Sequence, residues 1–150
     1  MNHADTAVEY FNKNFNCSQS VFTTFATELG MDEKLALKLG TDFGGGARKG
    51  ELCGAVAGAL LVLGLYYGHC ESDDLDGKAK AYKISEEFMN RFIQRNGSVV
   101  CRELLGYDLT KDKDMQIIKD KNLFGTICPE MIRNAAQILD EMLEELNCDK

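Results

Sequence analysis

The chain has 150 residues, of which 45% are hydrophobic and 27% are charged, a composition typical of one folded domain and unlike that of disordered chains. A domain of this length buries enough apolar surface to fold without disulfide bonds. Its formal net charge of −7 argues against nucleic acid as a partner, because nucleic-acid-binding domains present a basic face to the phosphates.

Neither a secretory signal nor a membrane span is predicted. The N-terminal segment MNHADTAVEYFNKNFNCSQS contains charged side chains and no apolar core, which a signal peptide needs. The longest uncharged stretch, residues 52–70, is interrupted by glycines and has a polar end, so a buried helix is favoured over a membrane-spanning one. We therefore expect a cytoplasmic protein with reduced cysteines, where metal ligands and redox groups are commoner than disulfides.

Apolar residues recur at helical spacing along most of the chain, and no alternating pattern typical of a strand is present. Capping residues support several helix starts, such as Asn16 and Asp32, and Gly30 ends the second helix. Helices are predicted over residues 4–14, 17–29, 32–39, 52–67, 75–95, 101–106, 112–121 and 128–146. The sequence predicts an all-α fold, a single-domain bundle of five to seven helices over residues 1–150.

A glycine-rich loop, within the segment GTDFGGGARKGELCGAVAG, separates the third and fourth predicted helices. Loop glycines can bring backbone N–H groups close to a bound group. Each glycine inside a helix costs about 1 kcal/mol relative to alanine, so those in the following helix indicate a packing or functional reason. The glycines expected to surround the site are Gly44, Gly45, Gly46, Gly50, Gly54 and Gly58.

Arg48 and Lys49 lie inside this loop in an otherwise acidic chain. One interpretation is that they neutralise an anionic centre or bind an anionic partner. The other is an ordinary solvated loop tip, and the sequence does not decide between them. The loop is not a phosphate-binding P-loop, because GxxxxGK followed by serine or threonine is absent.

Four of the six cysteines are predicted to lie at helix starts: Cys17, Cys53, Cys101 and Cys128. A helix N-terminus carries partial positive charge and free N–H donors, which lower the pKa of a thiol to roughly 3.5–7.5. If the four helix starts converge, their thiolates would surround one centre such as an iron–sulfur cluster. The spacing contains no CxxC pair, so it does not by itself distinguish a cluster from zinc, from reactive thiols or from buried structural cysteines.

The remaining two cysteines, Cys70 and Cys148, are expected to be spectators. Cys70 follows the end of a predicted helix, where the negative end of the helix dipole disfavours a thiolate. Cys148 lies close to the C-terminus, where helices fray. His3 and His69 have no neighbouring ligand residues in the pattern and are interpreted as ordinary surface residues.

The segments FNCSQSVF, FGGGARKGELCGAVAGALLVLGLYYG and CRELLG, followed by a last cysteine, resemble the redox-active proteins named for their C…GCAxxG…C…C pattern. The resemblance runs from Cys17 to the final helix. It implies that Cys17, Cys53, Cys101 and Cys128 are the four cysteines of that pattern. This chain departs from the motif in having Leu52 before and Gly54 after its second cysteine. The resemblance implies redox activity and says little about a substrate.

The favoured hypothesis is electron transfer through a cysteine-ligated iron–sulfur cluster, most simply [2Fe–2S], with an unidentified redox protein as partner. The alternatives are thiol–disulfide exchange without a cofactor, a structural zinc ion, and a non-enzymatic scaffold or sensor that docks to an oxidoreductase or transporter. Whether the chain is an enzyme stays open, and if it is one it would be an oxidoreductase. A homodimer that shares one cluster is a further option.

Overall fold

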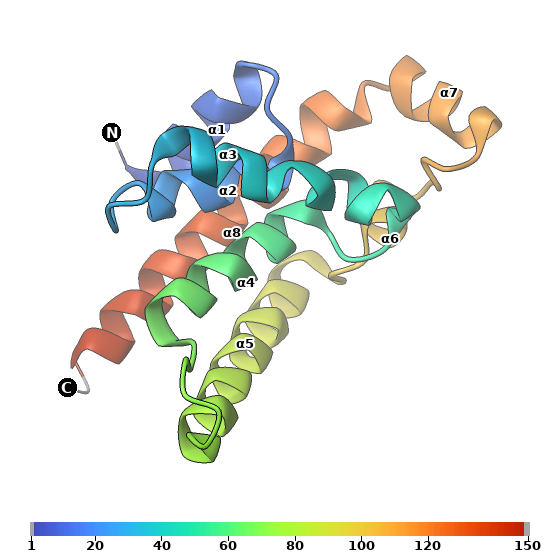
Figure 1. Cartoon of the computed structure of the whole chain (residues 1–150). Coiled ribbons are helices and arrows are strands. Elements are labelled where there is room, and N and C mark those ends of the chain that lie inside the picture. The colour runs from blue at the N-terminus through green and yellow to red at the C-terminus, as the bar shows by residue number, and fades with distance from the viewer. Residues whose placement is uncertain (1, 149–150) are drawn as a thin grey trace.

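The computed structural model describes residues 2–148, which form eight α-helices joined by short loops (Figure 1). The all-α class is confirmed, with slightly more helices than the five to seven expected. The helices are α1 His3–Asn12, α2 Cys17–Ala26, α3 Glu33–Gly40, α4 Gly54–Tyr67, α5 Leu75–Asn96, α6 Cys101–Leu105, α7 Asp112–Asp120 and α8 Leu123–Cys148. Two short helical turns, η1 Thr41–Phe43 and η2 Gly46–Gly50, connect α3 to α4.

Capping side chains fix the helix starts that the sequence indicated. Asn16 accepts a hydrogen bond from the backbone N–H of Gln19 at 2.9 Å, and the Gln19 side chain accepts one from the Asn16 N–H at 2.9 Å. This reciprocal pair satisfies two donors at the start of α2. Asp32 caps α3 in the same way by accepting from the N–H of Leu35 at 3.0 Å.

The main hydrophobic core lies between α2, α4, α5 and α8, with α1 against α8 and α3 against α2. Large side chains from these helices are almost completely buried, among them Phe22 and Phe25 of α2 and Phe88 and Phe92 of α5. The backbones of α2 and α4 approach closely at Gly58. A Cβ atom at this position would lie only 2.7 Å from the carbonyl oxygen of Ser18. Gly58 therefore serves helix packing.

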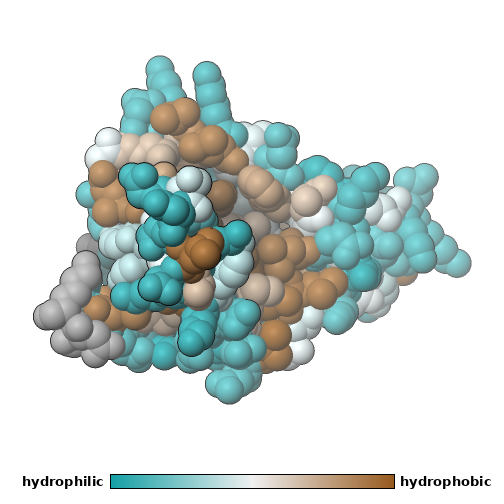
Figure 2. Space-filling view, turned by 60° about the horizontal axis from the view of Figure 1, so that its bottom comes forward, coloured by the Kyte–Doolittle hydropathy of each residue, from teal (hydrophilic) through white to brown (hydrophobic). Residues whose placement is uncertain are grey.

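Polar side chains cover most of the surface around this core. Figure 2 shows hydrophilic residues over much of one face, with smaller hydrophobic patches between them. On α1, the ring of His3 lies between two acidic side chains, with Nδ1 2.6 Å from Asp140 and Nε2 2.8 Å from Glu28. His3 thus links α1 to α8 and to the turn after α2. None of the described helices combines the length and apolar character that a membrane crossing requires.

The predicted start of the last helix is wrong. Helix α8 begins at Leu123, so Cys128 and Pro129 lie inside it, beyond its first turn. A helix over residues 128–146 would place Pro129 in the first turn, where proline is common. In the structure Pro129 has no N–H to donate to the carbonyl of Gly125, and the helix continues across this missing hydrogen bond.

Candidate functional site

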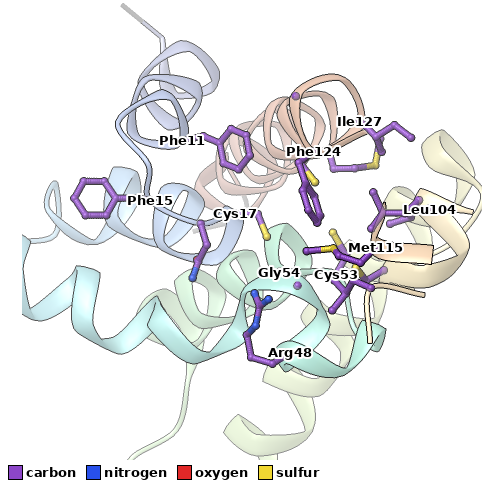
Figure 3. A pocket seen from close by; sticks show the side chains of 18 of the residues that line it. Phe11, Phe15, Cys17, Arg48, Cys53, Gly54, Leu104, Met115, Phe124 and Ile127 are labelled. Carbon is purple, nitrogen blue, oxygen red and sulfur yellow. The ribbon is translucent and has the colours of Figure 1, made fainter. Parts of the chain in front are cut away.

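A single cavity of about 460 Å³ is lined by Cys17, Cys53, Cys101 and Cys128 (Figure 3). The four cysteines come from α2, the start of α4, α6 and α8, which lie far apart in the sequence. The structure thus brings all four predicted cysteines to the wall of one cavity, and their role as ligands stays a prediction. Cys53 and Cys101 are buried, with 7% and 9% of their surface exposed.

The position of Cys17 follows from the way α2 is anchored. Cys17 is the first residue of α2, directly after the capping residue Asn16. The side-chain amide of Asn16 donates a hydrogen bond to the backbone carbonyl of Thr41 at 2.8 Å. The side-chain amide of Gln19 donates one to the backbone carbonyl of Leu37 at 2.9 Å. These bonds fix the start of α2 to the end of α3, and so hold the Cys17 sulfur at a defined place in the cavity wall.

Cys53 and Cys101 are brought side by side by a short antiparallel pairing. Leu52 forms an isolated bridge with Val100. The N–H of Cys53 donates to the carbonyl of Val99 at 2.7 Å, and the N–H of Cys101 donates to the carbonyl of Glu51 at 2.5 Å. These backbone hydrogen bonds join the segment before α4 to the segment before α6. No pattern in the sequence predicts this pairing.

Gly54 is required by the closeness of Cys17. A Cβ atom at Gly54 would lie 2.2 Å from the Cys17 sulfur and 3.0 Å from the carbonyl of Phe43. Real Cβ atoms do not approach other atoms so closely, so any larger residue would displace the thiol or the loop. The glycine that departs from the resembled motif, Gly54 after Cys53, is thus the residue that lets two cysteines from different helices share one cavity.

The other glycines expected around the site have several different tasks. Gly45 lines the cavity together with Gly54. A Cβ atom at Gly44 would meet the side chain of Asn16, and one at Gly46 would lie 2.9 Å from the Cβ of Cys101. Gly50 faces Asp108 and Arg102, and Gly58 packs against α2. Neither Gly50 nor Gly58 is among the residues that line the cavity.

The loop before α4 contains four consecutive residues with positive φ, from Gly45 to Arg48. The values are 66° and 64° for the two glycines, 56° for Ala47 and 65° for Arg48. Side chains disfavour this left-handed conformation by about 1–2 kcal/mol per residue. The turn carries Arg48 back toward the cavity, where its Nη1 donates to the carbonyl of Gly44 at 3.1 Å.

The two basic residues of the loop differ in position: Arg48 faces the cavity, whereas Lys49 lies at the solvated loop surface. The side chain of Arg48 lines the cavity, and Figure 3 shows it reaching up toward Cys17 and Gly54. Lys49 is exposed and is not among the lining residues. Arg48 is an exposed residue at the rim of the cavity. Among the described residues that line the cavity, no other carries a charged side chain.

Most of the remaining wall is apolar and was not identified from the sequence. One side comes from α1, with Phe11, and another from α8, with Phe124 and Ile127 (Figure 3). A small second core around Cys101, Leu105 and Ile118 holds α6 and α7 together, and it places Leu109 and Met115 on the cavity. The helical spacing of residues 112–121 predicted α7, but not that it would close this wall.

Burial raises the pKa of all four thiols, so the expectation of thiolates with a lowered pKa at helix starts is wrong for these residues in the absence of a bound group. For Cys17, burial raises the pKa more than the N–H groups of Gly45 and Ser18 and the charge of Arg48 lower it. Burial and then the neighbouring Cys17 raise the pKa of Cys53 to about 12. The N–H groups at the start of α4 lower it by less.

The other two thiols behave in the same way. Burial, followed by the closeness of Cys17, raises the pKa of Cys101 to about 11, although the positive charge of Arg48 opposes the shift. Burial also raises the pKa of Cys128, and the three other thiols add to this rise. The sulfurs of Cys53, Cys101 and Cys128 thus each feel the negative charge that neighbouring thiols would carry. A cationic group would be needed to hold several of them as thiolates together.

The donor set suits an iron–sulfur cluster in kind and number, since four cysteine thiolates hold a [2Fe–2S] or [4Fe–4S] cluster. Within residues 2–148, no three His, Cys, Asp or Glu side chains are arranged to hold a metal ion. The four cysteines therefore line a shared cavity without forming a ready-made site for a single ion such as zinc.

The two cysteines expected to be spectators lie elsewhere or outside the description. Cys70 is exposed in the loop between α4 and α5 and does not line the cavity. The side chain of Cys148 lies outside the described part of the chain, so the expectation for it stays a prediction. His3 is held by Asp140 and Glu28, and His69 is exposed.

The chain was compared with protein families, curated proteins and solved structures. A protein-family model described as “Putative redox-active protein (C_GCAxxG_C_C)” matches residues 15–142 of the chain. The match includes all four cysteines of the cavity and the whole glycine-rich loop. No curated protein matches, and no solved structure matches.

Proposed function

The chain belongs to the C_GCAxxG_C_C family of redox-active proteins, and from that premise we propose that Cys17, Cys53, Cys101 and Cys128 together hold one iron–sulfur cluster, most simply [2Fe–2S]. The observation that carries the proposal is that these four cysteines, from four separate helical segments, line one cavity. Four thiols is the number that such a cluster needs. In this proposal the chain is a single cytoplasmic domain that exchanges electrons with a separate redox protein.

The residues around the cysteines suit a buried anionic centre. The backbone N–H groups of Gly45 and Ser18 lower the pKa of Cys17, and those of Val56 and Ala55 lower the pKa of Cys53, so they favour negative charge on these sulfurs. Arg48 adds a positive charge at the rim. When bound, a cluster would supply one-electron transfer, and hydrogen bonds to its sulfurs and its burial would set the potential.

Apolar side chains would separate the same centre from water. Phe11, Phe124 and Ile127 form much of the wall on the α1 and α8 side. A low-dielectric wall strengthens the effect of each nearby charge or dipole on the centre. The loop N–H groups would therefore act on the centre more strongly than Arg48, whose exposed charge is partly screened by solvent.

Thiol–disulfide exchange is the second candidate, and the observation in its favour is that four free thiols share one cavity. In that chemistry two thiols would form one disulfide and release two protons and two electrons to an oxidised dithiol partner. The raised pKa values of the thiols count against it, because the thiolate is the reactive form.

The test is purification without oxygen, followed by analysis of iron, zinc and acid-labile sulfide, and an absorption spectrum. The proposal expects about two iron and two sulfide per chain for [2Fe–2S], with visible sulfur-to-iron absorption that is lost on oxygen exposure or chelation. A colourless protein whose thiols titrate reversibly in a two-electron step would replace it with thiol–disulfide exchange. Zinc without a redox response would refute both.

A further inference from the structure

The cavity is larger and more apolar than four cysteines account for. Its volume of about 460 Å³ is roughly three times that of an apolar cavity that holds benzene. It falls in the range of about 300–1,000 Å³ that is typical of small-molecule sites, which combine apolar walls with a few polar groups. We propose that the cavity, beside the cysteines, binds a small organic anion with an apolar body and one carboxylate or sulfonate group.

The apolar body would have a wall of matching chemistry. Phe11, Leu104, Leu109, Met115, Phe124 and Ile127 line the cavity from α1, α6, the loop after α6, α7 and α8. Figure 3 shows Phe124, Ile127, Leu104 and Met115 around one side of the space that the cysteines share. Aromatic and thioether side chains adapt to flat apolar groups, so this side suits a planar or aromatic body.

Arg48 argues for an anionic group on the ligand. The other four arginines of the chain each pair with a carboxylate: Arg91 with Glu87 and Glu145, Arg95 with Glu141, Arg102 with Glu51, and Arg133 with Asp5. Within residues 2–148, Arg48 has no carboxylate partner, and its guanidinium donates a hydrogen bond to the carbonyl of Gly44. A guanidinium group binds carboxylate and sulfonate oxygens through its remaining N–H donors.

The backbone around Arg48 points to the same conclusion. The left-handed turn that directs Arg48 to the cavity includes two residues with side chains, Ala47 and Arg48 itself, in a conformation that favours glycine. Such local strain persists where the surrounding structure holds it and is concentrated at functional sites. No acidic residue is among the described residues that line the cavity, so nothing there neutralises the charge of Arg48.

This inference goes beyond the proposed redox centre, because it concerns the space and charge beside the cysteines rather than what the cysteines hold. A ligand in this position would lie against the sulfur atoms and would cover one side of the centre. The binding experiment below does not need that chemistry to occur.

The probes are 8-anilinonaphthalene-1-sulfonate and its neutral sulfonamide, which differ in charge but hardly in shape. They are titrated by calorimetry into protein purified without oxygen. Iron and thiol content are measured on the same sample, so failure of binding and failure of the redox proposal are read separately. We expect one sulfonate per chain, with a dissociation constant on the order of 10–100 μM for a ligand of this size.

Arg48→Gln tests the anionic contact. It should weaken sulfonate binding about tenfold and change sulfonamide binding by less than about twofold, because only the sulfonate needs the charge. Lys49→Gln, which removes the neighbouring exposed charge, is the matched control and should change neither affinity by more than about twofold. An equal loss in both variants would overturn the inference in favour of a general charge effect, and an unchanged sulfonate affinity in Arg48→Gln would overturn it directly.

A bulky substitution tests the location. Leu109→Trp should weaken both probes at least about fivefold, because the larger side chain takes up cavity space. Leu75→Trp, at a position that is 69% exposed on α5, should leave both unchanged. Circular dichroism confirms that each variant is folded. An unchanged affinity of both probes for Leu109→Trp would rule out the cavity as the site. The lack of saturable one-to-one binding in the unmodified protein would do the same.

Discussion

The hydrophobic core and the cysteine cavity are built in opposite ways. In the core, regular helices bury Phe22, Phe25, Phe88 and Phe92 almost completely, with 2% or less of each exposed. Around the cavity, a loop with four positive φ values, the five-residue helix α6 and the short helix α7 form much of the wall. The core thus gains its stability from packing, and the cavity end gives up packing for space beside the cysteines.

The core therefore acts as the scaffold of the fold. At the cavity end, residues are placed to form the candidate site rather than to pack tightly. Helices α2 and α8 belong to both regions, since each contributes core side chains and a cysteine. The core can therefore hold Cys17 and Cys128 in place while the loop before α4 supplies Cys53 and Arg48. Substitutions at the two ends should have different consequences.

The largest difference is expected between two phenylalanines. Phe88→Ala should lower the free energy of unfolding by about 3–5 kcal/mol, because it removes a fully buried ring from the core. Phe124→Ala should cost less than about 2 kcal/mol, since part of its ring already faces the cavity. Urea denaturation followed by circular dichroism measures both values. Equal costs would mean that the cavity wall is packed as tightly as the core.

Two glycines of α4 should respond to alanine with opposite sign. Gly54→Ala should lower the free energy of unfolding by about 1–3 kcal/mol, because the new Cβ would collide with the Cys17 sulfur. Gly64→Ala should raise it by about 0.5–1 kcal/mol, since nothing lies within 4 Å of the new Cβ and alanine favours the helix. Thermal and urea denaturation give both numbers. A stabilising Gly54→Ala would contradict the close contact between α4 and Cys17.

The left-handed turn predicts a smaller effect with an unusual sign. Ala47→Gly should raise the free energy of unfolding by about 1 kcal/mol, because glycine adopts a φ of 56° without strain. Ala57→Gly, in the regular part of α4, should lower it by about 1 kcal/mol. A loss of stability in Ala47→Gly, measured in the same denaturation experiment, would show that the turn is not held in the left-handed conformation.

The smallest expected effect comes from His3, in the helical region. Burial lowers the pKa of His3, but its hydrogen bonds to Glu28 and Asp140 raise it more. The pKa of His3 therefore lies above its ordinary value of 6.5. The resulting stabilisation is fully present below pH 6.5 and is lost as the pH rises through the raised value. We expect less than about 1 kcal/mol, because the pair is partly exposed.

His3→Gln should remove this pH dependence between about pH 6 and 8, and His69→Gln, at an exposed position in the loop after α4, serves as the control. Urea midpoints across the pH series measure it. If stability instead rises with pH over this range and His3→Gln leaves the slope unchanged, the bridge between α1 and α8 is not formed in solution.

The helical scaffold could be predicted from the sequence because its determinants are local. Apolar spacing indicated α5, and the Asn16 and Asp32 caps gave the starts of α2 and α3. Pro129 misled the prediction for α8, since proline usually marks a first turn and here lies beyond it. A local rule also misjudged the thiols: helix starts favour thiolates, but burial of neighbouring sulfurs has the larger effect on their pKa.

The cavity could be predicted only in part, because its wall depends on contacts between distant segments. The four cysteines were identified from their predicted positions at helix starts and from the motif, but the pairing of Leu52 with Val100 that joins two of them has no local signal. The direction of Arg48 depends on φ values at two residues with side chains, which sequence rules assign to glycine. The apolar wall from α1, α7 and α8 follows from tertiary packing alone.

The central claim is that four particular cysteines act as one centre, and the iron content of single alanine variants tests it most directly. Alanine is chosen because a serine oxygen could itself bind iron. After purification without oxygen, Cys17→Ala, Cys53→Ala, Cys101→Ala and Cys128→Ala should each lose most of the iron and sulfide found in the unmodified protein. Cys70→Ala, whose thiol is exposed outside the cavity, should retain both. Full iron content in any of the four folded cavity variants, or equal loss in Cys70→Ala, would contradict the account.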